Sequence, residues 1–326
     1  LLLPTLGAWT SLRAASVAYA LLGLLLAVRA GRKRLQVAAW AVFVATGVTL
    51  VVGAVPRRTR LGERLLGVWE GPAGTVSVVD REGVKKLRFN GSFTLGGTED
   101  SRWEALQTHV ALLPASSCER VFYLGMGTGI TAGAALDHPV KRVVVSELVP
   151  EVVEAARTWF RDEVNGLFES PRVEIVAEDA RHRLARDDAR YDVVIGDLFF
   201  PWQVGTADLY TVEHFRAVRA RLAPGGRFVQ WLPCYQLSKA EFLAIARTMT
   251  EAFDLVTLWR GDFAARRPLL ALVGHETPTA LDPRVLVANA RALGEDEEIG
   301  LGRYATSLPF FFYVGNLTAG HELLAD

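Results

Sequence analysis

Three glycines alternate behind a short apolar run in the stretch VFYLGMGTGIT, residues 121–131. Glycine permits a tight turn and lets a ligand approach the backbone closely, so Gly125, Gly127 and Gly129 predict a binding loop. The spacing G-x-G-x-G differs from the dinucleotide pattern G-x-G-x-x-G, and no Lys-Ser/Thr pair of a phosphate loop follows. Taken alone, these glycines are equally consistent with a purely structural turn.

Three carboxylates follow other apolar runs farther along the chain. Glu147 comes about 20 residues after the glycines, an offset at which a carboxylate can accept both ribose hydroxyls. Asp179 can accept a hydrogen bond from an adenine amino group, or it can cap the helix that follows it. Asp197 ends the run YDVVIGD, and it can take a proton from a nucleophile or balance a cationic centre.

Together these positions favour an adenosyl ligand without a phosphate. No basic residue for binding a phosphate accompanies the glycines and the acids. We therefore expect S-adenosylmethionine or a close relative rather than a nicotinamide dinucleotide, with the sulfonium near Asp197.

Composition excludes several other classes of protein. The formal net charge is +0, so bulk electrostatics does not favour nucleic acid as a partner. The only cysteines, Cys118 and Cys234, are far apart, which argues against a disulfide framework and for a reducing compartment. Because the histidines do not share a ligand spacing with the cysteines, we expect no metal.

Strand and helix patterns alternate from residue 119 to about residue 275, and this order predicts a parallel, doubly wound, Rossmann-like α/β sheet. A β-hairpin pattern precedes it, with turns at 81–83 and 90–91. The expected domains are transmembrane segments, a linker with the hairpin, a Rossmann-like catalytic domain and a C-terminal extension, at 1–55, 56–98, 99–275 and 276–326.

Two uncharged stretches near the start of the chain predict two transmembrane helices. They are AASVAYALLGLLLAV (14–28) and LQVAAWAVFVATGVTLVVGAV (35–55), and the second exceeds the roughly 20 residues that cross a bilayer. A buried helical hairpin is the alternative. Basic residues follow both stretches, so the positive-inside rule does not fix the orientation. The expected metabolite ligand places the rest of the chain in the cytoplasm. Because the chain begins with LLLPTLG, we expect further membrane helices upstream.

Residues 68–275 resemble the spermidine synthase (polyamine aminopropyltransferase) family, which has the class I S-adenosylmethionine-dependent fold. The motifs that carry the resemblance occur in the family's order: RFNGSFTLGGTEDSRWEALQTHVALL, YLGMGTG, SEL, EDA, YDVVIGDLFFP, ADLYTVEHF and PGGRFVQ. The resemblance extends to membrane-fused bacterial members. It therefore implies a bacterial inner-membrane protein, and a homodimer is common in the family.

The resemblance also implies an activity and residue roles. A decarboxylated sulfonium would donate an aminopropyl group to a diamine, leaving methylthioadenosine. Asp197 would be the catalytic base, and the remaining positions would contact the ligands. Tyr210 would assist catalysis; Thr128 and Ala180 would join the glycines, Glu147 and Asp179 in binding the adenosyl ligand; Trp103, Thr94, Phe200, Gln230 and His109 would bind the substrates.

Four of these positions depart from the family pattern. Thr128 replaces an acid that grips the donor amine, and Phe200 replaces an Asp that binds the acceptor amine. Thr94 stands in place of a Gln, and Trp103 in place of a Tyr. Among nearby acids, Glu99, Asp100 or Glu104 can compensate for the lost charge.

These departures keep four functions open. The first is aminopropyl transfer to an amine. The second is a lyase that acts on S-adenosylmethionine without an acceptor, since Thr128 would tolerate the carboxylate of the intact ligand. Methyl transfer to a small molecule and a non-catalytic ligand-sensing domain are the others.

Overall fold

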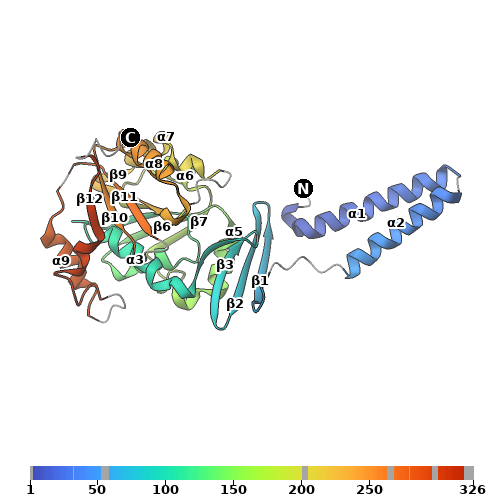
Figure 1. Ribbon diagram of the computed structural model, residues 1–326, viewed down its shortest axis with the longest axis horizontal. Helices are drawn as coiled ribbons and strands as arrows, with labels where there is room; N and C mark the ends of the chain where they lie inside the picture. The colour runs from blue at the N-terminus through green and yellow to red at the C-terminus, as the bar shows by residue number, and fades with distance from the viewer. Residues whose placement is uncertain are drawn as a thin grey trace. The chain divides into compact units, whose positions relative to one another are not determined.

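A computed structural model of the chain describes residues 3–31, 33–52, 59–199, 205–262, 268–278, 280–295 and 300–318 (Figure 1). The chain divides into two compact units, Leu1–Thr94 and Leu95–Asp326, and each is described by itself. The finer division expected from the sequence remains a prediction.

The N-terminal unit begins with two helices, α1 (Leu3–Arg29) and α2 (Lys33–Val52). Within α1, Ser11–Arg29 is long and apolar enough to cross a membrane, and large apolar side chains such as Tyr19 and Leu25 are exposed. The second predicted span, 35–55, extends into residues outside the described part. A pair of transmembrane helices therefore remains a prediction.

A four-stranded sheet follows, larger than the hairpin predicted from the sequence. Its strands, in sheet order, are β1 (Arg64–Gly71), β2 (Gly74–Arg81), β3 (Val84–Phe89) and β4 (Phe93–Gly97). The predicted turns are present, because both Glu82-Gly83 and Asn90-Gly91 have positive φ angles. Two consecutive positive φ values define the tight turn that suits the twist of a hairpin.

One ion pair in this unit is buried. Arg88, whose side chain is 1% exposed, donates to both carboxylate oxygens of Glu63, with Nη1 2.7 Å from Oε2. The hydrogen bond from Arg88 lowers the pKa of Glu63 from 4.5 to about 2. The carboxylate therefore stays ionised, and its stabilising effect is present above pH 4.5 and is lost as the pH falls through about 2.

We expect Glu63→Gln to lower the local free energy of unfolding of this sheet by about 3 kcal/mol, because it leaves a buried guanidinium without its counter-charge. Hydrogen–deuterium exchange of β1 to β3 in the full chain measures this. The control is Asp80→Asn, which removes the partner of Arg64 in an exposed pair at 3.9 Å. Such a pair contributes little, so equal exchange in the two variants would contradict the prediction.

The C-terminal unit contains an eight-stranded sheet in the order β12-β10-β11-β9-β8-β5-β6-β7. Its strands are β5 (Arg120–Leu124), β6 (Arg142–Glu147), β7 (Val173–Ala177), β8 (Tyr191–Gly196), β9 (Leu222–Pro233), β10 (Leu255–Arg260), β11 (Leu269–His275) and β12 (Tyr313–Asn316). The five strands from β9 to β7 are parallel, whereas β10, β11 and β12 pair antiparallel. The Rossmann-like α/β sheet predicted from the sequence is confirmed.

Helices cover both faces of this sheet (Figure 1). They are α3 (Ser101–Leu112), α4 (Ile130–Gly133), α5 (Pro150–Trp159), α6 (Ala180–Arg186), α7 (Val212–Arg219), α8 (Lys239–Ala252) and α9 (Pro283–Ala292). Aromatic rings fill the core beneath α7 and α8, where Phe228 lies between Phe215 and Phe253. Because central strands are buried on both faces, their sequences are continuous apolar runs rather than alternating ones.

The chain passes from β5 outward to β6 and β7, and then returns to β8 on the other side of β5. In an open α/β sheet, ligands bind outside the carboxyl ends of the strands at such a reversal. The segment 308–317, expected to be a strand or a docking segment, forms a short 3-10 helix (Leu308–Phe312) and then β12 at the sheet edge.

Candidate active site

The glycine loop follows β5, at the point where the strand order reverses. Gly125, Gly127 and Gly129 all have positive φ angles, at 83°, 54° and 87°. A side chain is excluded at Gly127 for a second reason, because an added Cβ would lie 2.8 Å from the carbonyl oxygen of Leu95. The loop therefore brings bare backbone to the strand ends, as the sequence predicted.

Glu147, the last residue of β6, holds this loop. Its Oε2 accepts the N–H of Met126 at 2.9 Å, and its Oε1 accepts the N–H of Val149 at 2.9 Å. Burial raises its pKa, while these backbone bonds act in the opposite direction. One carboxylate oxygen thus binds the glycine loop and the other binds the turn after β6. Ribose binding by Glu147 remains a prediction.

Asp197 follows β8 and is half-buried. Its Oδ1 accepts the N–H of Leu198 at 2.8 Å, and burial raises its pKa to about 6. Burial is also the main cause of the raised pKa values of Glu104, Glu147 and Tyr210, and the negative charge of Asp197 adds to each shift. The structure therefore places three ionisable groups, Glu104, Glu147 and Tyr210, near Asp197.

Tyr210 lies in the segment before α7 and is buried. Its hydroxyl donates to the carbonyl oxygen of Phe199 at 2.7 Å, which fixes the backbone just after Asp197. This contact positions the segment that carries Asp197. A direct role of Tyr210 in catalysis remains a prediction.

Glu104 was one of three acids that the sequence offered as replacements for the missing charge in the loop. From α3, its Oε2 accepts a hydrogen bond from the Thr128 hydroxyl at 2.6 Å, and its Oε1 accepts the N–H of Gly97 at 3.0 Å. Burial raises its pKa to about 8. Thr128, its hydrogen-bond partner in the glycine loop, is 24 residues away in sequence. No local sequence pattern therefore distinguishes Glu104 from Glu99 or Asp100.

Gln230 does not have the substrate-binding geometry expected from the sequence. Its side chain is 0% exposed and packs against Gly196, where an added Cβ would lie 2.4 Å from the Gln230 Oε1. Its Nε2 donates to the carbonyl oxygens of Asp197 and Trp231, at 3.1 Å each. Gln230 therefore positions the strand end that carries Asp197 and is closed off from a ligand.

Asp179 serves as the helix cap that the sequence left as an alternative. Its Oδ1 accepts the N–H of Arg181 at 2.9 Å, and the Arg181 guanidinium pairs with it and with Asp208. The hydrogen bond from Arg181 is the main cause of its lowered pKa. Ala180 begins α6 directly after this cap. An adenine contact by Asp179 and Ala180 remains a prediction.

Four more residues were predicted to bind substrate: His109, Trp103, Thr94 and Phe200. His109 is buried and its Nδ1 lies 3.0 Å from the Nε2 of His138, just before β6; burial lowers both pKa values, to about 4 and about 3. This histidine pair lies at the amino end of β6, and substrate binding by His109 remains a prediction. Trp103 stacks with Arg102 at 4.5 Å, and Thr94 is exposed on β4. Phe200 lies outside the described residues.

The arrangement suits a cationic ligand. Three carboxyl groups, Glu104, Glu147 and Asp197, surround the glycine loop, and none forms an ion pair with a described Lys, Arg or His. A buried carboxylate without a counter-charge is costly, and a bound cation would offset that cost. Within the described ranges, no group of three or more His, Cys, Asp or Glu side chains is placed to hold a metal ion.

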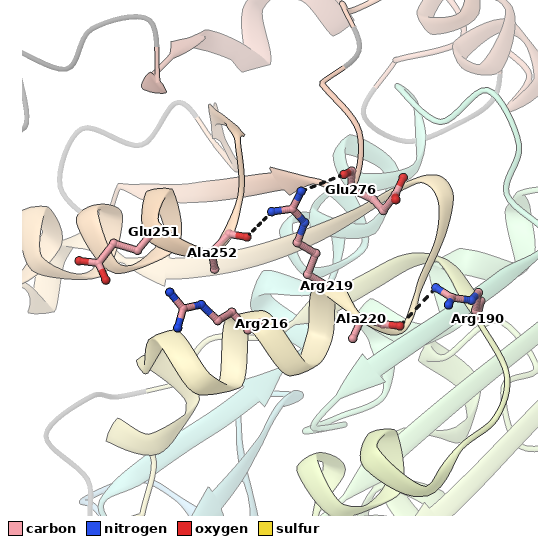
Figure 2. Close-up of a pocket in the computed structure, with 7 residues that line it drawn as sticks. All are labelled: Arg190, Arg216, Arg219, Ala220, Glu251, Ala252 and Glu276. Atoms are coloured by element: carbon pink, nitrogen blue, oxygen red, sulfur yellow. Dashed lines mark hydrogen bonds between the residues drawn. The ribbon is translucent and has the colours of Figure 1, made fainter.

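A hollow of about 480 Å³ lies apart from these carboxyl groups and is lined by Arg190, Arg216, Arg219, Ala220, Glu251, Ala252 and Glu276 (Figure 2). Arg219 donates there to the carbonyl oxygen of Ala252, and Arg190 donates to that of Ala220. Main-chain oxygens already accept hydrogen bonds from these two guanidinium groups. This hollow therefore differs from the strand-end site, where carboxyl groups lack a described basic partner.

Comparison with known families agrees with this geometry. The model of the spermine/spermidine synthase domain matches residues 102–259, which include the glycine loop, Glu147 and Asp197. This part of the chain is therefore similar to the spermine/spermidine synthase domain. The match begins just before Glu104 and ends within β10, so it covers the whole parallel part of the sheet.

Curated relatives of this chain bear the name polyamine aminopropyltransferase. One, polyamine aminopropyltransferase 2 of Pseudomonas aeruginosa, is 33% identical over 177 residues, which cover 53% of this chain and 51% of the relative. Another, polyamine aminopropyltransferase 2 of Hyperthermus butylicus, is 34% identical over 161 residues, which cover 48% and 52%. The chain thus spans about half the length of these relatives.

Solved structures share the fold of this chain. Spermidine synthase from Thermotoga maritima superposes with a TM-score of 0.62 at 18% identity, covering 76% of this chain and 86% of that chain. A spermidine synthase in complex with the transition-state analogue AdoDATO also superposes with a TM-score of 0.62 at 18% identity. At this identity the likeness establishes a common fold.

Proposed function

We propose that the protein is an aminopropyltransferase that uses decarboxylated S-adenosylmethionine as its donor and a polyamine precursor as its acceptor. The observation that carries the proposal is the set of three carboxyl groups, Glu104, Glu147 and Asp197, around a glycine loop with no described cation paired to them. Decarboxylated S-adenosylmethionine carries a sulfonium and an ammonium and no carboxylate or phosphate. Its charges therefore complement this site.

In the proposed reaction, the acceptor nitrogen attacks the methylene carbon that is bonded to the sulfonium. A carbon–nitrogen bond forms while the carbon–sulfur bond breaks, and the electron pair of that bond stays on sulfur, giving neutral methylthioadenosine. Asp197 takes a proton from the attacking amine, which leaves the new carbon–nitrogen product neutral at that nitrogen. Glu147 holds the ribose and the loop, and Gln230 and Tyr210 fix the backbone that flanks Asp197.

Product analysis tests this proposal. The full chain is incubated with intact or decarboxylated S-adenosylmethionine, with and without putrescine, and the products are identified by mass. We expect methylthioadenosine together with an aminopropylated diamine, formed only from the decarboxylated donor and only when the acceptor is present. Methylthioadenosine formed from the intact sulfonium without an acceptor would instead support the lyase that Thr128 suggested.

The pH dependence of turnover provides a further prediction. Asp197 must be ionised to accept a proton, and burial raises its pKa to about 6 in the free protein. Below that pH the carboxyl group is protonated and cannot act as a base, so we expect kcat/KM to fall about tenfold for each pH unit. A profile measured with saturating acceptor that stays flat well below pH 6 would contradict the assignment of Asp197 as the base.

We also propose that α1 and α2 anchor the protein in a bacterial inner membrane with the synthase domain in the cytoplasm, where the sulfonium donor is made. The exposed apolar side chains of α1 support lipid contact. Detergent, but not high salt, should release the full chain from the membrane fraction. Release by salt alone would indicate peripheral attachment. A homodimer, implied by the family resemblance, remains a prediction.

A further inference from the structure

Glu104 and Thr128 form a linked pair between α3 and the glycine loop. The Thr128 hydroxyl donates to Glu104 Oε2 at 2.6 Å and accepts the N–H of Ile130 at 3.3 Å. The N–H of Gly97 donates to the other carboxylate oxygen at 3.0 Å. These bonds fix the Glu104 carboxylate from two sides in a defined orientation.

The end of β4 packs closely over this pair. An added Cβ on Gly96, whose φ is +147°, would lie 2.7 Å from Glu104 Oε1 and 2.8 Å from Thr128 Cγ2. Only glycine leaves room for the carboxylate there. Thr128 itself is buried, at 2% exposure. The pair is therefore a tightly built feature rather than a chance contact between flexible side chains.

The charges around Glu104 have one sign. Asp197 and Asp100 both act on it with negative charge, and no described basic side chain offsets them. Neutral donors such as the Thr128 hydroxyl and the Gly97 N–H satisfy only part of the hydrogen-bonding capacity of a carboxylate, which has about four acceptor positions. The vacant acceptor capacity is suited to an N–H donor that also carries a positive charge.

We infer that Glu104, oriented by Thr128 and Gly97, binds the primary ammonium group of a substrate chain. The inference rests on the proposed function and assigns the cation-binding role within it to α3 rather than to the glycine loop. Thr128 then acts as a positioning residue. In place of a carboxylate in the loop, the Thr128 hydroxyl holds the carboxylate of Glu104, which comes from α3.

The assignment has a consequence for donor choice. Intact S-adenosylmethionine carries a carboxylate beside its ammonium group, and that carboxylate would meet the negative charges of Glu104 and Asp197. Like charges at close range are destabilising, so the site should prefer the decarboxylated donor. A bound ammonium would also favour the ionised form of Glu104. Because burial keeps the pKa of Glu104 at about 8 in the free protein, binding at neutral pH should release a proton.

Calorimetric titration of the full chain tests the inference with three ligands: methylthioadenosine, decarboxylated S-adenosylmethionine and the intact form. We expect Glu104→Gln to weaken the decarboxylated donor about 30-fold, the size of a lost hydrogen bond to a charged group, and to leave methylthioadenosine unchanged. Proton release, obtained by comparing buffers of different ionisation enthalpy, should disappear in the variant. The matched control is Glu154→Gln on the exposed face of α5, which should change neither quantity.

The ammonium can belong to the donor or to the acceptor, and the assay separates the two. If it belongs to the acceptor, Glu104→Gln leaves donor affinity intact and instead raises the KM for putrescine by a similar factor. Unchanged donor affinity together with an unchanged KM overturns the inference, as does a loss of methylthioadenosine binding, which would indicate a structural role. If the wild-type chain binds none of the adenosyl ligands, the proposed function itself fails.

Discussion

Replacing Asp197 with Asn is expected to lower kcat by about 10³-fold, the range for loss of a general base, while methylthioadenosine still binds. The amide keeps the shape of the side chain and can still accept the N–H of Leu198, so the end of β8 is maintained. What it loses is the ability to take a proton from the attacking amine. Single-turnover measurements with bound donor isolate this chemical step from binding.

The control for this prediction is Asp187→Asn. Asp187 follows α6 and likewise accepts a backbone N–H, from Ala189 at 2.9 Å, but it lies before β8, at the amino end of that strand. Its replacement should leave kcat unchanged. Full turnover in Asp197→Asn would remove Asp197 from the role of base, and a parallel loss of methylthioadenosine affinity would show that its role is structural.

Glu147→Gln is expected to weaken every adenosyl ligand by about 100-fold, because charged hydrogen bonds of this kind contribute up to about 3 kcal/mol. Both oxygens of Glu147 accept backbone N–H groups, from Met126 and Val149. A glutamine must turn its NH₂ group toward one of these two N–H groups. Two hydrogen-bond donors then face each other, which displaces the loop. The effect should be the same for methylthioadenosine and for the decarboxylated donor, since both carry the ribose.

Asp192→Asn provides the matched control for Glu147. Its Oδ2 accepts two backbone N–H groups, those of Glu119 and Arg120, at the amino end of β5 instead of the carboxyl end. The Asp192→Asn variant should be destabilised about as much as the Glu147→Gln variant, and it should bind the adenosyl ligands normally. If Glu147→Gln binds them as tightly as the wild type, the carboxylate is not part of the ribose site.

The sequence predicted the elements that position the site because each depends on local chemistry. Apolar runs that end in glycine or an acid identified the ends of β5, β6 and β8, and the structure places those ends at the strand-order reversal. The same local signal left Asp179 ambiguous. A carboxylate at the strand end can either cap the following helix or bind an adenine base, and the structure contains the cap.

Contacts between distant segments could not be predicted in this way. The bond between Thr128 and Glu104 joins α3 to the loop after β5, and nothing in the spacing of either segment encodes it. The orientation of the Gln230 side chain could not be predicted for a related reason. A glutamine at the expected position in a strand can face a ligand or the core, and only the packing against Gly196 shows that it faces the core.

The fit between Gly196 and Gln230 limits how this sheet can change over evolutionary time. A methyl group at position 196 would occupy the space of the Gln230 amide, so alanine there requires a shorter residue at 230 in the same lineage. A shorter residue at 230, in turn, releases the main chain that carries Asp197. Descendants should therefore keep both residues or exchange both, and an exchange should be accompanied by a new anchor for the base.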